Sequence, residues 1–525
     1  MGTSSLFDVK NKVQYMYFDK ICRYGKNDIV FWCEGSSFMN FNSLQFMVFL
    51  PIVLILYYAV PLRFRHVLLL IASYMFYGAF SKKYAAFLFF FTVVSYCFAR
   101  LISKADKDKR LAKFYLISCI IFHIGALGYF KYTNFGIQIV NSIVSTSIES
   151  WNIIMPLGIS FYTFKVLSYL IDVYRDKSRV QKNFFKYAAY IAYFPQVTSG
   201  PIERSERFFS ELNNKRDFDE KDISSGVIRM LWGFMKKMVI VDRMSIIVGS
   251  VYANYSNYGR TILFITTIIY SIQIYFDFSA YSDIAIGISR MFGFRFMENF
   301  KFPYCARNIG EFWRRWHISL SLWFRDYLYI PLGGNRKGVI RQYINIVIVF
   351  LISGIWHGAS FNFIFWGFLH GFYQVMGAIL KPVREYFLKL FKVDKNRFSY
   401  RLGQTVLTFM LVNFAWIFFR ADGLKNGLAI VKQITVGTSN LWQIFDGTLY
   451  TLGLTQSSFD LMFVMTIIVL IFEYIHNEKR DLVEGFSRQG IIFRCFVYYS
   501  ILFVIFIFGI YGASNGSGHF IYGQF

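Results

Sequence analysis

Apolar and polar residues occur along this chain in long blocks rather than in the short periods of a soluble protein. From residue 44 onward, apolar runs follow one another with short polar breaks between them. Many of these runs reach the roughly 20 residues that a helix needs to cross a bilayer. They lie at 44–60, 66–80, 84–102, 114–130, 152–171, 184–200, 226–250, 261–276, 339–356, 359–380, 402–420, 459–476 and 491–512, and shorter stretches at 133–148 and 280–294 either span, dip in or lie at the interface. The pattern predicts an all-α, polytopic transmembrane protein with about 11–13 helices.

Two regions depart from this pattern. Residues 1–38 are mixed polar and aromatic and contain no spanning run, so we interpret them as a polar N-terminal extension, disordered or interfacial, before a transmembrane domain at 39–525. They also lack the apolar core of a signal peptide, and no cleaved leader is expected. Residues 295–341 are aromatic and apolar yet rich in Lys and Arg. For this second region the sequence predicts re-entrant or interfacial helices buried against protein.

Composition and charge support a membrane protein. Hydrophobic residues make up 55% of the chain and charged residues only 17%, against about 25% charged in soluble domains. The formal charge of +25 first suggests nucleic acid, but the basic residues cluster between apolar runs, at 104–113, 175–186, 204–221 and 381–401. That distribution is typical of cytoplasmic loops of a multi-pass protein surrounded by membrane lipids, so no nucleic-acid partner is predicted. The six cysteines are scattered without metal-ligand spacing, and no metal site is predicted.

Two Trp-His pairs are the main candidates for chemistry. His357 follows Trp356 between two apolar runs, with Gly354 and Gly358 on either side. Ionisable groups at membrane depth are costly and usually functional, and histidine transfers protons near neutral pH. We favour a functional role for His357 over a core histidine that is bonded to a carbonyl or to Asn362.

The other pair places His317 in a basic segment. If 312–329 is one helix, then Arg314, His317, Ser321 and Arg325 fall within about 80° of one another. Such a stripe suits an anionic ligand, and a neighbouring cation would disfavour protonation of His317. A second interpretation stays open at this point. The segment would be an interfacial helix whose arginines meet lipid phosphates, with a merely packed histidine.

Other polar residues in apolar surroundings are weaker candidates. Asp277 and Asp283 could orient a histidine or pair with Arg314 or Arg325, and a structural ion pair is the favoured interpretation. For His370 we favour helix packing.

Several stretches, taken in order, resemble the membrane-bound O-acyltransferase (MBOAT) superfamily, and within it the bacterial alginate O-acetyltransferase branch. The similarity extends from about residue 39 to the C-terminus, with a motif core at about 155–420. Residues 1–38 are then an extension or the product of a start codon set too early, and Gly523 stands where an aromatic residue is common. The stretches that carry the resemblance are 155–164, 194–204, 276–293, 299–334, 356–362 and 414–420.

The resemblance implies an O-acyltransferase of the bacterial cytoplasmic membrane, with His357 and His317 as the catalytic histidines. It implies no bound cofactor, and a cytoplasmic donor substrate that is acetyl-CoA or an acyl carrier thioester. The acceptor would be a hydroxyl on an extracytoplasmic cell-wall polymer or exopolysaccharide, reached through a separate acetyl-transferring partner protein. The candidates for binding donor or substrate are Arg314, Ser321, Arg325, Trp313, Asn362 and Asp277.

Two alternatives remain. The first is a D-alanyl or lipid O-acyltransferase of the same superfamily, because 316–321 and 199–202 resemble the relative that D-alanylates teichoic acid. Residues 330–335 are closer to the acetyltransferase branch. The second is a proton-coupled secondary transporter with a histidine relay, which the lack of an internal repeat in the sequence disfavours.

Overall fold

The computed structural model describes residues 39–105, 107–214, 217–479, 485–486, 488–511 and 520. It comprises two compact units, Met1–Met47 and Val48–Phe525. The predicted extension 1–38 lies outside the described residues. The described part of the chain is helical and contains no strand, as the apolar pattern predicts.

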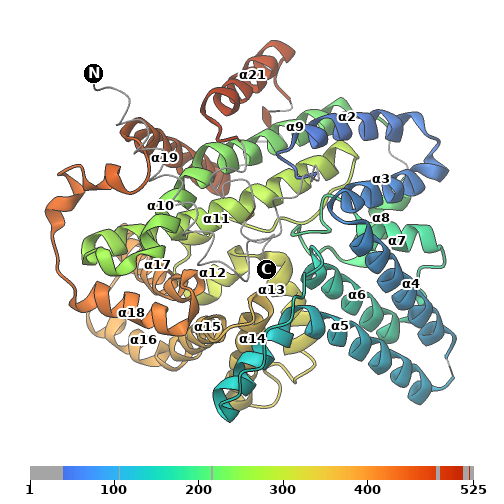
Figure 1. Ribbon diagram of the computed structural model, residues 1–525, viewed down its shortest axis with the longest axis horizontal. Coiled ribbons are helices and arrows are strands. Elements are labelled where there is room, and N and C mark those ends of the chain that lie inside the picture. Colours follow the sequence, from blue (N-terminus) through green and yellow to red (C-terminus); the bar gives the residue numbers. More distant parts are fainter. Residues whose placement is uncertain are drawn as a thin grey trace, which may run out of the picture. The chain divides into compact units, whose positions relative to one another are not determined.

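The helices follow the predicted apolar blocks closely (Figure 1). Two pairs of predicted blocks merge into single long helices, 114–130 with 133–148 in α5 and 261–276 with 280–294 in α11. The bounds, with the labels of Figure 1, are α2 Leu44–Ala59, α3 Arg65–Phe80, α4 Lys82–Lys104, α5 Lys109–Val144, α6 Ile159–Arg175, α7 Phe184–Ala192, α8 Ser205–Asn213, α9 Glu220–Met235, α10 Asp242–Ala253, α11 Arg260–Met291, α12 Ile309–Arg315, α13 Ile318–Phe324, α14 Val339–His357, α15 Phe361–Ile379, α16 Lys381–Leu390, α17 Phe398–Arg420, α18 Gly423–Val436, α19 Gln456–Lys479 and α21 Ile491–Phe508.

Seven helices in the described residues are long and apolar enough to cross a membrane, namely α4, α5, α11, α14, α17, α19 and α21. An eighth span is formed if α15 and α16, which meet at a bend of 48°, count as one. This is fewer than the 11–13 helices predicted, because several apolar blocks form shorter helices. Helix α6 has 17 residues and α7 has 9. The block at 226–250 is divided by a π-helical turn, Lys236–Val241, between α9 and α10.

Helices α9 and α11 lie side by side and bury charged residues between them and the π-helical turn (Figure 1). Lys237 is only 2% exposed, and its Nζ lies 3.0 Å from a carboxylate oxygen of both Asp277 and Asp242. Lys236 pairs in the same way with Asp283, at 2.7 Å. Burying a charge is tolerated only where it is paired, so these ion pairs fix how α9, α10 and α11 pack.

The segment 295–341, predicted not to span as a plain helix, forms short elements as far as residue 338, and its last three residues begin α14. Helices α12 and α13 have seven residues each, and a π-helical turn, Arg325–Tyr329, follows them. Their aromatic side chains pack inward: Trp316 is 1% exposed and Trp313 is 8% exposed. The basic residues of this segment are therefore kept at its outer side while the tryptophans join the core.

Helices α14 and α15 form a tight hairpin that positions His357. A Cβ added at Gly354 would overlap the carbonyl oxygen of Phe363, and one added at Gly358 would overlap the Phe363 ring. Only glycine allows this close approach of the two helices. The glycines on either side of His357 therefore bring the start of α15 against the end of α14.

Candidate active site

His317 lies at a break in the chain rather than on a continuous helix. Its φ is +42°, in the left-handed region, and it separates α12 from α13. The predicted helix over 312–329 is therefore wrong, and so is the stripe built on it: His317 is fully buried, whereas Arg314 is exposed. A non-glycine residue in this conformation is strained, and such strain is often found at functional sites.

Asn299 holds the strained turn in place. Its Oδ1 accepts hydrogen bonds from the Ser319 backbone N–H at 3.2 Å, from Ser319 Oγ at 2.9 Å and from His317 Nδ1 at 3.2 Å. Its Nδ2 donates to Ser282 Oγ on α11 at 3.2 Å. Because Oδ1 can only accept, the proton of a neutral His317 is on Nδ1.

Burial keeps His317 neutral. It lowers the pKa of His317 from 6.5 to about 3, because the imidazolium would lose its hydration. The sequence also predicts a lowered pKa, but attributes it to a neighbouring arginine. The cause in the structure is burial among aromatic rings, with Phe278 at 4.6 Å between ring centroids.

His357 is the last residue of α14 and is 1% exposed. Its ring lies in an aromatic enclosure, with centroid distances of 4.9 Å to Trp356, 5.1 Å to Trp366 and 5.3 Å to Phe419. An imidazole held between tryptophan and phenylalanine rings is shielded from water and restricted in orientation. The restricted orientation suits a general base, which must be held within reach of the proton that it removes.

Tryptophan rings connect the buried histidines. Trp356 contacts both predicted catalytic residues, at 4.9 Å from His357 and 6.3 Å from His317. Trp366 lies 5.1 Å from His357 and 5.0 Å from His370. The structure therefore brings the two Trp-His pairs, 40 residues apart in sequence, into one aromatic cluster.

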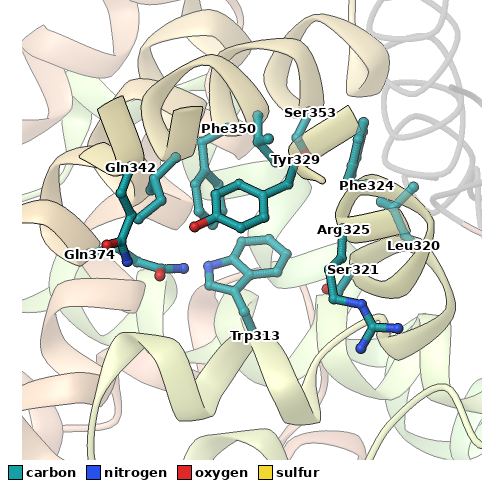
Figure 2. Close-up of a pocket in the computed structure, with 12 residues that line it drawn as sticks. Trp313, Leu320, Ser321, Phe324, Arg325, Tyr329, Gln342, Phe350, Ser353 and Gln374 are labelled. Atoms are coloured by element: carbon teal, nitrogen blue, oxygen red, sulfur yellow. The ribbon is translucent and has the colours of Figure 1, made fainter. Parts of the chain in front are cut away.

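A cavity of about 330 Å³ is lined by Trp313 (Figure 2), whose ring lies 5.9 Å from that of Trp366 in this cluster. Its α14 wall consists of Gln342, Ile346, Val349, Phe350 and Ser353, which share one helix face. The remaining lining residues are Trp313, Leu320, Ser321, Phe324, Arg325, Tyr329 and Gln374. Figure 2 shows Gln342 and Gln374 on one side of the Trp313 ring and Ser321 and Arg325 on the other. The cavity is thus mainly apolar, with amide, hydroxyl and guanidinium groups at its edges.

Three of the six predicted binding residues line this cavity: Trp313, Ser321 and Arg325. Trp313 also donates its indole N–H to His370 Nδ1, at 3.2 Å. This bond ties α12 to α15 and agrees with a packing role for His370. The binding roles of the three residues remain predictions.

The other three predicted binding residues lie elsewhere. Arg314 is exposed and is not among the lining residues. Asn362 donates its amide N–H groups to the Phe418 and Ala421 carbonyls, both at 3.0 Å, at the end of α17. Asp277 forms the structural ion pair favoured from the sequence, with Lys237 as its partner rather than Arg314 or Arg325. Their binding roles have no support from the cavity.

Sequence reasoning missed three residues that organise the site: Asn299, Ser353 and Lys131. Lys131 on α5 donates from Nζ to the Trp356 carbonyl and, at 3.3 Å, to the His357 carbonyl. Helical spacing along 342–353 contained a usable signal, because its lining residues recur every three to four positions. Asn299 and Lys131 had no such signal, since each acts across a long gap in sequence. Among the described residues, no three His, Cys, Asp or Glu side chains gather as a metal site.

Together the fold and the site define a polytopic helical membrane protein with buried histidines and a partly open, mainly apolar cavity. Residues 175–396 match the MBOAT, membrane-bound O-acyltransferase family. The chain is 40% identical over 391 residues to the "Probable alginate O-acetylase AlgI" of Pseudomonas syringae pv. tomato, covering 74% of this chain and 73% of that protein. It is 34% identical over 427 residues to the peptidoglycan O-acetyltransferase of Helicobacter pylori, covering 75% and 79%.

A more distant relative is the teichoic acid D-alanyltransferase of Bacillus subtilis, 29% identical over 286 residues and covering 51% of this chain and 69% of that protein. The extent of the similarity to the two O-acetylating proteins identifies the family: this chain belongs to the membrane-bound O-acyltransferases. It is an O-acyltransferase enzyme, as the resemblance implied.

Proposed function

We propose that this enzyme moves an acetyl group from a cytoplasmic thioester donor to a hydroxyl of an extracytoplasmic polymer, with His357 as the general base. One observation carries the proposal. The cavity-lining face of α14 runs from Gln342 to Ser353, and His357 is the next residue on that face, four positions on. The cavity therefore leads along one helix toward the candidate base.

The distribution of charge supports a direction for this path. Helix α14 begins just after Arg336 and Lys337, and its neighbour α5 begins in the basic stretch 104–113. Basic loops stay on the cytoplasmic side. Eighteen residues separate Val339 from His357, which corresponds to about 27 Å of helix. His357 then belongs to the extracytoplasmic half of the membrane, and Gln342 belongs to the cytoplasmic half.

The cavity suits the donor side of the reaction. Acetyl-CoA and acyl carrier thioesters share a narrow flexible arm that contains two amide groups and ends in the thioester. Apolar walls with the amides of Gln342 and Gln374 match that arm, and Arg325 is an exposed cation at the cavity edge for a phosphate at its far end. The shared arm does not distinguish acetyl-CoA from a carrier protein.

The chemistry follows from the histidines. His357 removes the proton from the acceptor hydroxyl as its oxygen attacks the thioester carbonyl, forming a C–O bond. Collapse of the tetrahedral intermediate breaks the C–S bond, and the thiolate takes the proton from His357. His317 assists on the donor side, where its bond to Asn299 holds the proton on Nδ1 and fixes the ring. No net proton is gained or lost.

The nature of the acceptor is proposed from the relatives. Their names specify alginate, peptidoglycan and teichoic acid as targets. These polymers lie outside the cytoplasmic membrane, so we place this enzyme in that membrane with an exopolysaccharide or cell-wall polymer as its acceptor. The two O-acetylating relatives favour acetyl over D-alanyl as the group transferred. Where an extracytoplasmic partner protein carries acetyl onward to the polymer, the hydroxyl that His357 activates belongs to that partner.

The test follows label from donor to product. Membranes containing wild-type protein or His357→Ala protein receive acetyl-CoA labelled in the acetyl group, and label is then counted in polymer, lipid and protein fractions. The proposal predicts His357-dependent label in the polymer. Label in lipid alone would show a lipid O-acyltransferase. Flux of a solute driven by a pH gradient, with no acyl transfer, would show a transporter.

A further inference from the structure

Two adjacent residues of α5, Lys131 and Tyr132, donate hydrogen bonds to backbone carbonyls at the C-terminal end of α14, the helix that carries His357. The last carbonyls of any helix have no partner within the helix. At the end of α14, Tyr132 Oη donates to the Ile355 carbonyl at 2.8 Å. Lys131 Nζ donates to the next two carbonyls, those of Trp356 and, at 3.3 Å, of His357. Three consecutive carbonyls are thereby held by one point on a neighbouring helix.

Lys131 also reaches a third element and an aromatic face. Its Nζ lies 3.3 Å from Ser160 Oγ at the start of α6 and 5.7 Å from the centroid of the Trp356 ring. Lys131 therefore links α5, α6 and α14 at the residue pair Trp356-His357. A cation is stabilised at a helix C-terminus by the partial negative charge of the exposed carbonyls.

The position of Lys131 within α5 argues against a chance contact. Lys131 lies 22 residues after Lys109 within a helix long and apolar enough to cross a membrane. An ammonium group in such a segment is costly and is retained where it has a specific partner. A side-chain amide has two donors, whereas an ammonium has three and satisfies two carbonyls and the serine hydroxyl.

We propose that Lys131 is a positioning residue for acyl transfer: it fixes the last turn of α14 and thereby sets the imidazole of His357. The inference rests on the proposed function, which makes His357 the base. The enclosure around His357 restrains the ring through Trp366 and Phe419. The backbone that carries the ring is restrained by Lys131. A base displaced by about 1 Å from its productive position loses about 100-fold in rate.

The test compares purified variants in the acetyl-transfer assay, with melting temperature measured in parallel. Lys131→Met keeps the length of the side chain and removes its donors, and it is expected to lower kcat about 100-fold while KM for the donor stays within about threefold. Lys131→Arg restores a cation with several donors and is expected to recover most of kcat. Tyr132→Phe removes one of the three carbonyl contacts and is expected to have a smaller effect.

Lys165 provides a matched control. It is a buried lysine on α6 whose Nζ donates to the Tyr190 carbonyl at 3.2 Å and to Gln196 Oε1 at 3.1 Å, neither of which belongs to α14. Lys165→Met tests what the loss of a buried lysine does to folding. We expect it to lower the melting temperature at least as much as Lys131→Met, with kcat per folded molecule within about threefold of wild type.

A double-mutant cycle separates this inference from the proposed function. If Lys131 acts through His357, the Lys131→Met/His357→Ala protein has the same residual rate as His357→Ala alone. A further loss in the double mutant, or a wild-type kcat for Lys131→Met, would overturn the positioning role and leave the proposed function intact. A wild-type rate for His357→Ala would overturn the proposed function itself.

Discussion

Ser353 lies one helical turn before His357 on α14, and it lines the cavity at the end nearest His357 along this helix. If the thioester reaches His357 through this cavity, a large side chain at position 353 blocks its reactive end. We expect Ser353→Phe to lower kcat by at least about tenfold, since small misplacements of the reacting groups have large effects on rate. The measurement is steady-state acetyl transfer per folded enzyme. Ile352→Phe is the control, because Ile352 is 37% exposed on another face of α14.

Substitutions of Arg325 and Arg314 distinguish two hypotheses for donor binding: the cavity, and the helix face on which the sequence analysis placed both arginines. Arg325 lines the cavity and Arg314 does not. We expect Arg325→Ala to raise KM for acetyl-CoA about 5- to 30-fold with little change in kcat, because a charge-assisted contact to phosphate contributes about 1–2 kcal/mol to binding. Arg314→Ala should leave both constants near wild type. Equal effects of the two substitutions would count against the cavity as the donor site.

We expect Asn299 to contribute both to the stability of the fold and to the activity that depends on His317. Asn299→Leu removes the acceptor for three donors at a buried turn, and each donor left unpaired costs about 1–3 kcal/mol. We therefore expect a large fall in melting temperature together with loss of activity. Asn299→Asp keeps the acceptor and should fold better than Asn299→Leu. If Asn299→Leu melts like wild type, the network around His317 is not as described.

Acid should destabilise the protein through His317. The pKa of His317 is lowered by burial from 6.5 to about 3. Between these values the unfolded chain binds a proton that the folded protein does not, so this contribution to stability is complete above pH 6.5 and is lost as pH falls toward 3. From pH 7 to pH 5 the loss is about 2 kcal/mol. Unfolding in detergent at the two pH values should show a smaller difference for His317→Gln. An equal pH dependence in both proteins would contradict a buried neutral His317.

Substitution of Lys237 tests whether Asp277 serves as a structural ion-pair partner rather than as a binding residue. Lys237→Met leaves the carboxylates of Asp277 and Asp242 buried without their ammonium partner, and we expect a loss of about 3–5 kcal/mol of stability. Lys301 is exposed, so Lys301→Met is a control with an expected change below about 0.5 kcal/mol. Adding Asp277→Asn to Lys237→Met should recover part of the loss. If Asp277→Asn alone instead raises KM for the donor without destabilising the protein, Asp277 has the binding role first assigned to it.

The hydrophobic pattern predicted the helices well because each span is specified by its own residues. Helix α14 needs only a local apolar run between Arg341 and Gly358. The same local reasoning failed where tertiary contacts decide the backbone. His317 adopts a left-handed conformation because Asn299, 18 residues away, binds both its ring and the start of α13. Nothing in the local sequence 312–329 specifies that break.

The candidate site was only partly predictable for the same reason. The two histidines stand out in the sequence because a titratable group in an apolar setting is rare. Lys131 does not stand out, although it contacts the backbone of His357 from 226 residues away. Asp277 was recognised as a member of an ion pair, but its partner was misassigned, since Lys237 was taken as part of an apolar run at 226–250.

The most direct test of this account is the rate of acetyl transfer by His357→Ala protein, measured in detergent or reconstituted membranes and divided by the amount of folded enzyme. Removal of a general base typically costs 10²–10⁴-fold, so we predict a residual rate about 1,000-fold below wild type with an unchanged melting profile. A folded His357→Ala enzyme that transfers acetyl within a few-fold of the wild-type rate would contradict the assignment of His357 as the reaction centre.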